Sequence, residues 1–143
     1  MKLDELYAKL DPWAPYALSI LRIMAALLFL QHGLQKLIGF PPNPDAAGPP
    51  LLSLMGLAGL IELVGGGLVT VGLFTRIGAF VLSGEMAFAY FLEHAPQGFM
   101  PIDNGGDLAV LFCFVFFYLV FAGPGPWSLD AMIKPVTPTT HQG

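Results

Sequence analysis

Residues 15–38 read PYALSILRIMAALLFLQHGLQKLI, and this stretch decides the class of fold. A hydrocarbon layer about 30 Å thick is crossed by roughly 20 mostly apolar residues in a helix. Three further apolar stretches follow at about 51–74, 77–94 and 105–122, separated by segments rich in Pro, Gly and polar residues. The sequence therefore predicts an all-α, four-helix transmembrane bundle that forms one domain over residues 1–143, with a loose tail at about 131–143.

The composition favours a membrane protein and excludes several other classes. Of the 143 residues, 55% are hydrophobic and 11% are charged, whereas soluble domains have about 25% charged residues. The formal net charge of −4 disfavours nucleic acid as a partner. The single cysteine, Cys113, cannot form an intrachain disulfide, and no haem, flavin or iron–sulfur motif occurs. A redox role would thus need a bound quinone or a partner subunit.

The distribution of basic residues predicts the orientation of the helices. The cytoplasmic ends of membrane helices retain Lys and Arg. The side of both termini carries Lys2, Lys9, Arg76 and Lys134, and the opposite side carries Lys36 at a helix end. We therefore expect a multi-pass protein with both termini in the cytoplasm. Residues 3–10 have apolar side chains at helical spacing and are expected to form an amphipathic helix on the inner surface.

Few charged residues interrupt the apolar stretches, where a charge costs about 2.5 to 3.5 kcal/mol at a helix centre. Counted along antiparallel helices, Arg22, Glu62 and Glu85 reach similar depths in the inner half of the bundle. We expect these three residues to form an intramembrane polar cluster, with an ion pair between Arg22 and one of the glutamates. Such a pair either fixes how the helices meet or takes part in carrying a proton.

A second polar group lies at the outer ends of the predicted helices and consists of His32, Lys36, His94, Asn104 and Asp107. His32 and Lys36 are four residues apart and share a helical face. Asp107 begins the fourth helix, where a carboxylate suits the positive end of the helix dipole. No HxxxH or ExxH pair occurs, so no metal site is predicted. The group is either a hydrated polar rim or a site for a ligand or a proton.

Small residues predict which helix faces meet. Gly59 and Gly66 lie three residues before and four residues after Glu62, and Gly78 shares a face with Glu85. Small side chains let helix backbones approach closely in lipid. The acidic residues are therefore expected to point into the bundle. Glu93 is assigned to the hydrated rim.

Three segments, taken in order, resemble the DoxX family of small bacterial membrane proteins. They are LRIMAALLFLQHGLQKLIG at 21–39, LIELVGGGLVTVGLFTRIGAF at 60–80, and NGGDLAVLF at 104–112 followed by AGPGPWSLD at 122–130. The resemblance covers roughly residues 17–130, and Asp107 stands where the family often has Glu. It implies a four-helix protein of the bacterial inner membrane, in a family associated with quinone-linked sulfur oxidation and membrane-associated oxidoreductase complexes.

Three hypotheses about function follow. The preferred one is an accessory subunit of a membrane oxidoreductase system, with a quinone-head or proton site formed by His32, Lys36 and Asp107 above the intramembrane polar cluster. The second is a small carrier or proton-coupled permease, which with four helices would need to form a homo-oligomer. The third is a structural or assembly protein without activity of its own. The expected partners are the lipid bilayer, oxidoreductase subunits and further copies of the chain.

Overall fold

The computed structural model describes residues 2–43 and 51–133. The described elements are all helical, which confirms the predicted all-α class. In chain order they are α1 (Leu3–Leu10), the 3-10 turn η1 (Asp11–Trp13), α2 (Ala14–Ile38), α3 (Leu54–Val71), α4 (Thr75–Ala89), the π-helical turn η2 (Tyr90–His94), the 3-10 turn η3 (Ala95–Gln97), α5 (Pro101–Asn104), α6 (Asp107–Ala122) and α7 (Leu129–Ile133).

The long helices lie close to the predicted stretches. By length and composition, the segments Leu3–Ile38 and Leu54–Val71 could cross a membrane, and α6 is apolar but shorter, with 16 residues. Helix α7 continues to Ile133, so the first three residues of the predicted loose tail are helical. The rest of that tail, including Lys134, lies outside the described residues, as do residues 44–50 of the loop between α2 and α3.

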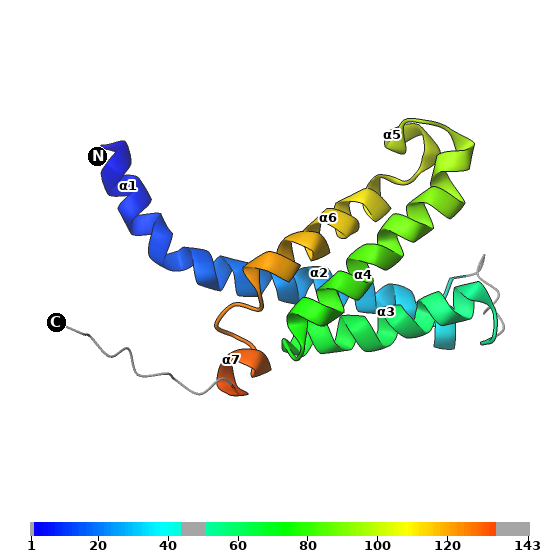
Figure 1. Ribbon diagram of the computed structural model, residues 1–143, viewed down its shortest axis with the longest axis horizontal. Helices are drawn as coiled ribbons and strands as arrows, with labels where there is room; N and C mark the ends of the chain where they lie inside the picture. Colours follow the sequence, from blue (N-terminus) through cyan, green and yellow to red (C-terminus); the bar gives the residue numbers. More distant parts are fainter. Residues whose placement is uncertain (1, 44–50, 134–143) are drawn as a thin grey trace.

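Two antiparallel helix pairs, α2 with α3 and α4 with α6, make up most of the fold. Figure 1 shows that the pairs meet near the turn between α3 and α4 and diverge toward α5. Within the first pair the backbones approach closely: a Cβ atom on Gly33 would lie 2.6 Å from the amide nitrogen of Leu63, and one on Gly66 would lie 3.2 Å from Cα of Leu30. The glycines of this pair therefore mark the contact face, as the spacing of small residues predicts.

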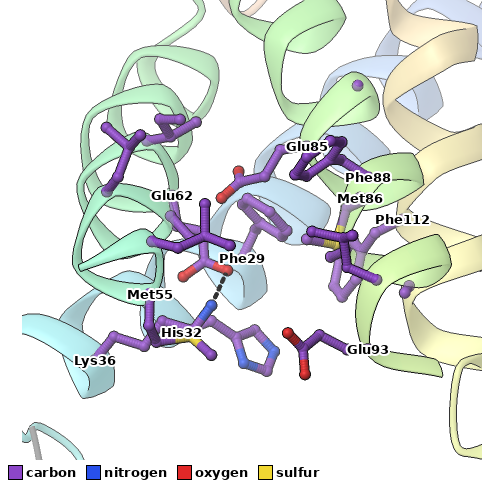
Figure 2. Close-up of a pocket in the computed structure, with 18 of the residues that line it drawn as sticks. Phe29, His32, Lys36, Met55, Glu62, Glu85, Met86, Phe88, Glu93 and Phe112 are labelled. Atoms are coloured by element: carbon purple, nitrogen blue, oxygen red, sulfur yellow. Dashed lines mark hydrogen bonds and ion pairs between the residues drawn. The ribbon is translucent and has the colours of Figure 1, made fainter. Parts of the chain in front are cut away.

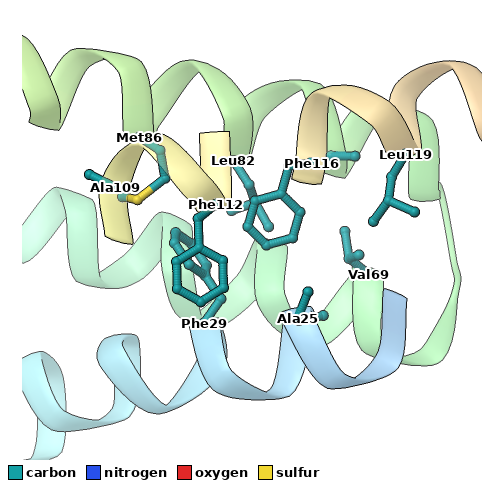
Figure 3. Packing of buried hydrophobic residues seen from close by; sticks show 11 residues of the cluster. Ala25, Phe29, Val69, Leu82, Met86, Ala109, Phe112, Phe116 and Leu119 are labelled. Carbon is teal, nitrogen blue, oxygen red and sulfur yellow. The ribbon is translucent and has the colours of Figure 1, made fainter. Parts of the chain in front are cut away.

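An aromatic core joins the two pairs. The ring of Phe29 on α2 lies 5.0 Å from Phe116 and 5.4 Å from Phe112 on α6, both in edge-to-face geometry. Leu82 of α4 and Val69 of α3 are fully buried beside these rings (Figure 3). The outward faces are apolar as well; Phe114 and Phe121 of α6 are 64% and 67% exposed. The fold thus presents apolar side chains on its outside, as a lipid-facing protein does.

The segment after α6 folds back over the turn between α3 and α4. We call residues 123–130 the C-terminal clasp. The carboxylate of Asp130 accepts hydrogen bonds from the backbone amides of Phe74 (2.8 Å) and Thr75 (2.9 Å), and its own amide donates to the carbonyl of Gly72 (2.8 Å). Asp130 thereby supplies the N-terminal cap of α4 from a distant part of the chain. The turn falls at residues 72–74, not at Thr75 and Arg76 as the sequence predicts, because Gly72 ends α3 in the left-handed conformation.

Candidate functional site

A cavity of about 880 Å³ lies at the end of the helix pairs that is remote from the C-terminal clasp. Its walls come from the second half of α2, the first half of α3, the second half of α4 with η2, and the start of α6. Apolar and aromatic side chains dominate them, among which are Phe29, Met55, Ile61, Met86, Phe88 and Phe112 (Figure 2). Its size and mostly apolar walls are typical of sites for small organic ligands.

An ion pair forms one polar part of the wall. Lys36 Nζ of α2 lies 2.6 Å from Glu62 Oε1 of α3. The Glu62 residue is only 2% exposed, and its second carboxylate oxygen, Oε2, has no hydrogen-bond partner among the described residues. The close approach of α2 and α3 at Gly33, one helical turn from Lys36, places the two side chains within reach of each other. The pair thus places one buried carboxyl oxygen without a partner among the described residues, Glu62 Oε2, at the wall of the cavity.

Glu85 of α4 lies across the cavity from this pair. Figure 2 shows its carboxylate directed toward the side of Glu62. Both carboxylate oxygens of Glu85 are buried and have no hydrogen-bond partner in the described part of the chain. Glu62 and Lys36 are the charged groups that interact with it electrostatically. The two glutamates of the predicted intramembrane polar cluster therefore do face one cavity.

His32, Glu93 and His94 lie nearer the end of the helix pairs. Figure 2 shows His32 of α2 and Glu93 of η2 pointing toward each other, and both line the cavity together with His94. The Nδ1 atom of His94 lies 3.0 Å from the carbonyl oxygen of Asn104. Single π-helical turns inside α-helices are frequent at functional sites, and η2 is the element that carries both Glu93 and His94.

The remaining residues of the predicted outer group have other surroundings. Asn104 is buried; its side chain donates to the carbonyl of Gly98 (2.8 Å) and accepts from the amide of Gly106 (2.8 Å), so it organises the loop before α6. Asp107 is exposed at the first turn of α6 and is not among the cavity-lining residues. In the part of the chain that the structure describes, no group of three or more His, Cys, Asp or Glu is arranged to hold a metal ion.

Arg22 lies away from the cavity, and the ion pair expected with Glu62 or Glu85 is not formed. The Arg22 Nη2 atom donates to the carbonyl oxygen of Trp127 in the C-terminal clasp, and Asp130 is its electrostatic partner. Arg22 lies beside Gly72, ten residues after Glu62 on α3. At 1.5 Å per residue this separates the two charges by about 15 Å along the helix axis.

Some cavity residues were not identified from the sequence. Glu93 was assigned to the hydrated rim, although it lines the cavity. The three phenylalanines of the wall, Phe29, Phe88 and Phe112, come from three helices, and in sequence they resemble the exposed aromatics around them. No local sequence signal distinguishes cavity-lining phenylalanines from outward-facing ones. The cavity arises where the two helix pairs diverge, which neighbouring residues do not reveal.

Comparison with known proteins gives a consistent family assignment. The DoxX family model matches residues 17–95. An uncharacterized protein of Haemophilus influenzae is 47% identical over 128 residues, covering 85% of this chain and 93% of its own length. An uncharacterized membrane protein of Mycobacterium tuberculosis is 32% identical over 141 residues, covering 84% of this chain and 83% of its own.

A second uncharacterized protein of Haemophilus influenzae is 32% identical over 135 residues and covers 86% of this chain and 87% of its own length. No solved structure gives a significant match. The family model matches more than half of the chain, and one of the relatives carries the name of a membrane protein. This chain therefore belongs to the DoxX family and is a membrane protein.

Proposed function

We propose that the cavity holds the head of a membrane quinone and that the chain is a non-catalytic subunit of a quinone-linked oxidoreductase system in the bacterial inner membrane. The observation that carries this proposal is the meeting of aromatic walls with buried acidic groups in one cavity of about 880 Å³. A quinone has the matching parts, a flat ring and an apolar tail beside two polar oxygens. The DoxX assignment and the name of the mycobacterial relative support the membrane setting.

The residues present fit such a head group. Phe29, Phe88 and Phe112 provide aromatic surface on which a flat ring can pack. Glu62 and Glu85 offer carboxylate oxygens that lack partners within the described residues. When bound, a quinone supplies the electron-accepting chemistry, for which the sequence has no other recognisable motif. The chain's own residues would orient the head and hold protons at the glutamate oxygens, while the apolar walls exclude water.

We further propose that α2, α3, α4 with η2, and α6 each cross the membrane, with both termini in the cytoplasm. The apolar exterior supports this arrangement, as does the position of Lys2, Lys9 and Arg76 on the side of the C-terminal clasp. Helix α1, which extends away from the helix pairs in Figure 1, would lie on the inner membrane surface through Leu3, Tyr7 and Leu10.

Cysteine labelling in intact cells tests this topology. In a Cys113→Ser background, Phe99→Cys is expected to react with a membrane-impermeant thiol reagent, because Phe99 is 92% exposed in the loop between η3 and α5. Met132→Cys, 79% exposed at the opposite end, is expected to react only after the cells are opened. Labelling of both positions in intact cells would contradict the proposed topology.

Filling the cavity tests the proposed ligand. Gly84 of α4 lines the cavity, and a Cβ atom placed there meets nothing within 4 Å in residues 2–43 and 51–133. Gly84→Phe is therefore expected to fold and to weaken binding of a short-chain quinone, in its oxidised and its reduced form, by at least about tenfold, or about 1.4 kcal/mol. Calorimetric titration of the purified protein in mild detergent measures the affinity for each form.

The matched control is Gly67→Phe. Gly67 of α3 has equally open surroundings but does not line the cavity. This variant is expected to bind like the unmodified protein. If neither form of the quinone binds the unmodified protein, or if both variants lose affinity equally, the proposed site is wrong.

A further inference from the structure

We infer that the cavity opens sideways into the lipid between α3 and α4, and that the apolar tail of its ligand lies in this opening. The residues that border it line the cavity and are also exposed: Leu54, Leu57, Val81, Phe88 and Leu92. We call these residues the side opening. This inference rests on the proposed function, because it takes the ligand to be a quinone with a tail and the helices to cross the membrane.

Helices α3 and α4 are in close contact near their turn and separate beyond it. A Cβ atom on Gly78 would lie 2.9 Å from Cγ2 of Val69, and one on Gly65 would lie 2.7 Å from Cδ2 of Leu82. Two residues further along α4, a Cβ atom on Gly84 would meet no atom of the described residues within 4 Å. The two helices therefore part at about Gly84, and Figure 1 shows them diverging from their turn.

The border of the side opening is apolar. Leu57 of α3 and Phe88 of α4 both line the cavity, yet they are 51% and 59% exposed. A side chain that lines a cavity and is also exposed lies where the cavity reaches the outer surface. The other residues of the side opening are exposed in the same way. Such a border favours contact with an apolar chain over contact with water.

The opposite side of the cavity, between α2 and α6, is closed by rings. The ring of Phe112 lies 5.4 Å from that of Phe29 and 6.4 Å from that of His32, measured between centroids. Beyond these rings lies a second hollow of about 280 Å³, whose wall includes the amide side chains of Gln31 and Gln35. His32 and Phe112 line both spaces and so stand between them. An apolar tail therefore leaves the cavity more easily between α3 and α4.

The polar groups of the wall determine which end of the ligand points outward. Glu62 Oε2 and both carboxyl oxygens of Glu85 are buried and have no hydrogen-bond partner within residues 2–43 and 51–133. Buried polar groups of this kind are satisfied by a polar head and not by a tail. Because Glu85 directly follows Gly84, the head lies at the inner end of the side opening. The tail then passes Leu57 and Phe88 into the outer half of the bilayer in the proposed topology.

Photolabelling tests the position of the tail on the unmodified, full-length protein in phosphatidylcholine vesicles. The probe is a quinone that carries a photoreactive diazirine at the end of its tail. After irradiation, mass spectrometry of the peptides is expected to find the label at residues 54–57 or 88–92. An excess of the same quinone head without a tail is expected to remove this label, because both molecules occupy one cavity. Label at Leu28, Gln31 or Gln35 that the head removes would place the tail between α2 and α6.

Two variants test whether the side opening selects the ligand. Leu57→Trp places a large ring in the side opening, so it is expected to lower the affinity for the tailed quinone at least about tenfold while the tail-free head binds as before. Leu60→Trp is the matched control, because Leu60 of α3 is 50% exposed but does not line the cavity. This variant is expected to bind both molecules like the unmodified protein. Titrations in one detergent measure the affinities, and unchanged binding of the tail-free head shows that a variant is folded.

The outcomes separate this inference from the proposed function. Label between α2 and α6, or equal affinities of the two tryptophan variants for the tailed quinone, would overturn the inference and leave the cavity as a quinone site. If the tail-free head removes no label and neither molecule binds the unmodified protein, the proposed function itself is wrong, and the inference is wrong with it.

Discussion

Gly72→Ala is expected to destabilise the folded protein by about 3 kcal/mol or more and to lower its melting temperature in detergent accordingly. Gly72 ends α3 with φ at +74°, a conformation that costs residues with a side chain about 1 to 2 kcal/mol. An added Cβ atom would also overlap the guanidinium group of Arg22 and lie 2.9 Å from Cα of Ser128. The C-terminal clasp would have to move, and Arg22 would lose its bond to the Trp127 carbonyl.

Gly39 provides the control for the backbone contribution. It ends α2 with φ at +68°, and a Cβ atom there would meet no atom of the described residues within 4 Å. Gly39→Ala is therefore expected to lower the free energy of unfolding by only about 1 kcal/mol, because the left-handed backbone conformation is its only source of strain. Thermal unfolding of both variants under the same conditions measures the difference. Equal shifts would mean that close packing of the clasp on Arg22 and Gly72 does not contribute to stability.

Gly33→Ala is expected to destabilise the protein by about 2 kcal/mol and to weaken ligand binding as well. The added Cβ atom would lie 2.6 Å from the amide nitrogen of Leu63 and 2.9 Å from the carbonyl oxygen of Gly59. Both are backbone atoms, so α2 and α3 would have to separate, and overpacking of this kind costs about 1 to 3 kcal/mol. The separation would disturb the Lys36–Glu62 ion pair one helical turn away. Thermal unfolding and the quinone titration measure the two effects.

Gly67→Ala is the corresponding control in a helix interior. A Cβ atom at Gly67 meets nothing within 4 Å in the part of the chain that the structure describes, and alanine favours the helix over glycine by about 1 kcal/mol. This variant is expected to melt at the same or a higher temperature and to bind the quinone normally. A Gly33→Ala protein that behaved in the same way would show that the close approach of α2 and α3 is not needed for the cavity.

The sequence predicted the helices well and their ends less well. Apolar runs identify the long helices, because the length and composition of such runs are properties of the chain itself. The ends depend on capping groups. Ser53 starts α3 through a local hydrogen bond from the Gly56 amide, whereas α4 is capped by Asp130, more than fifty residues away. Only the first kind of cap can be read from neighbouring residues.

Only part of the candidate site could be predicted from the sequence, because the rest depends on contacts between residues far apart in the chain. Counting residues from the expected helix ends gave Arg22, Glu62 and Glu85 similar depths, and this was wrong for Arg22, which lies beside Gly72, ten residues after Glu62. Such counting does not fix the register of an antiparallel pair. The register follows from the contact of Gly33 with Gly59 and Leu63, which sets Lys36 beside Glu62. Aligning the small residues of the two helices would have indicated this pairing. The cavity itself depends on the divergence of two helix pairs and has no local signal.

The contact between Arg22 and Trp127 also bears on how the chain is made. The two residues are 105 positions apart, so during synthesis the arginine leaves the ribosome long before the carbonyl that receives its hydrogen bond. An unpaired arginine in a bilayer is unfavourable by about 2.5 to 3.5 kcal/mol near a helix centre. The nascent protein therefore carries an uncompensated charge until Trp127 has emerged. A prematurely terminated product that lacks Trp127 would keep the unpaired Arg22 side chain, which distinguishes it from the full-length protein during biogenesis.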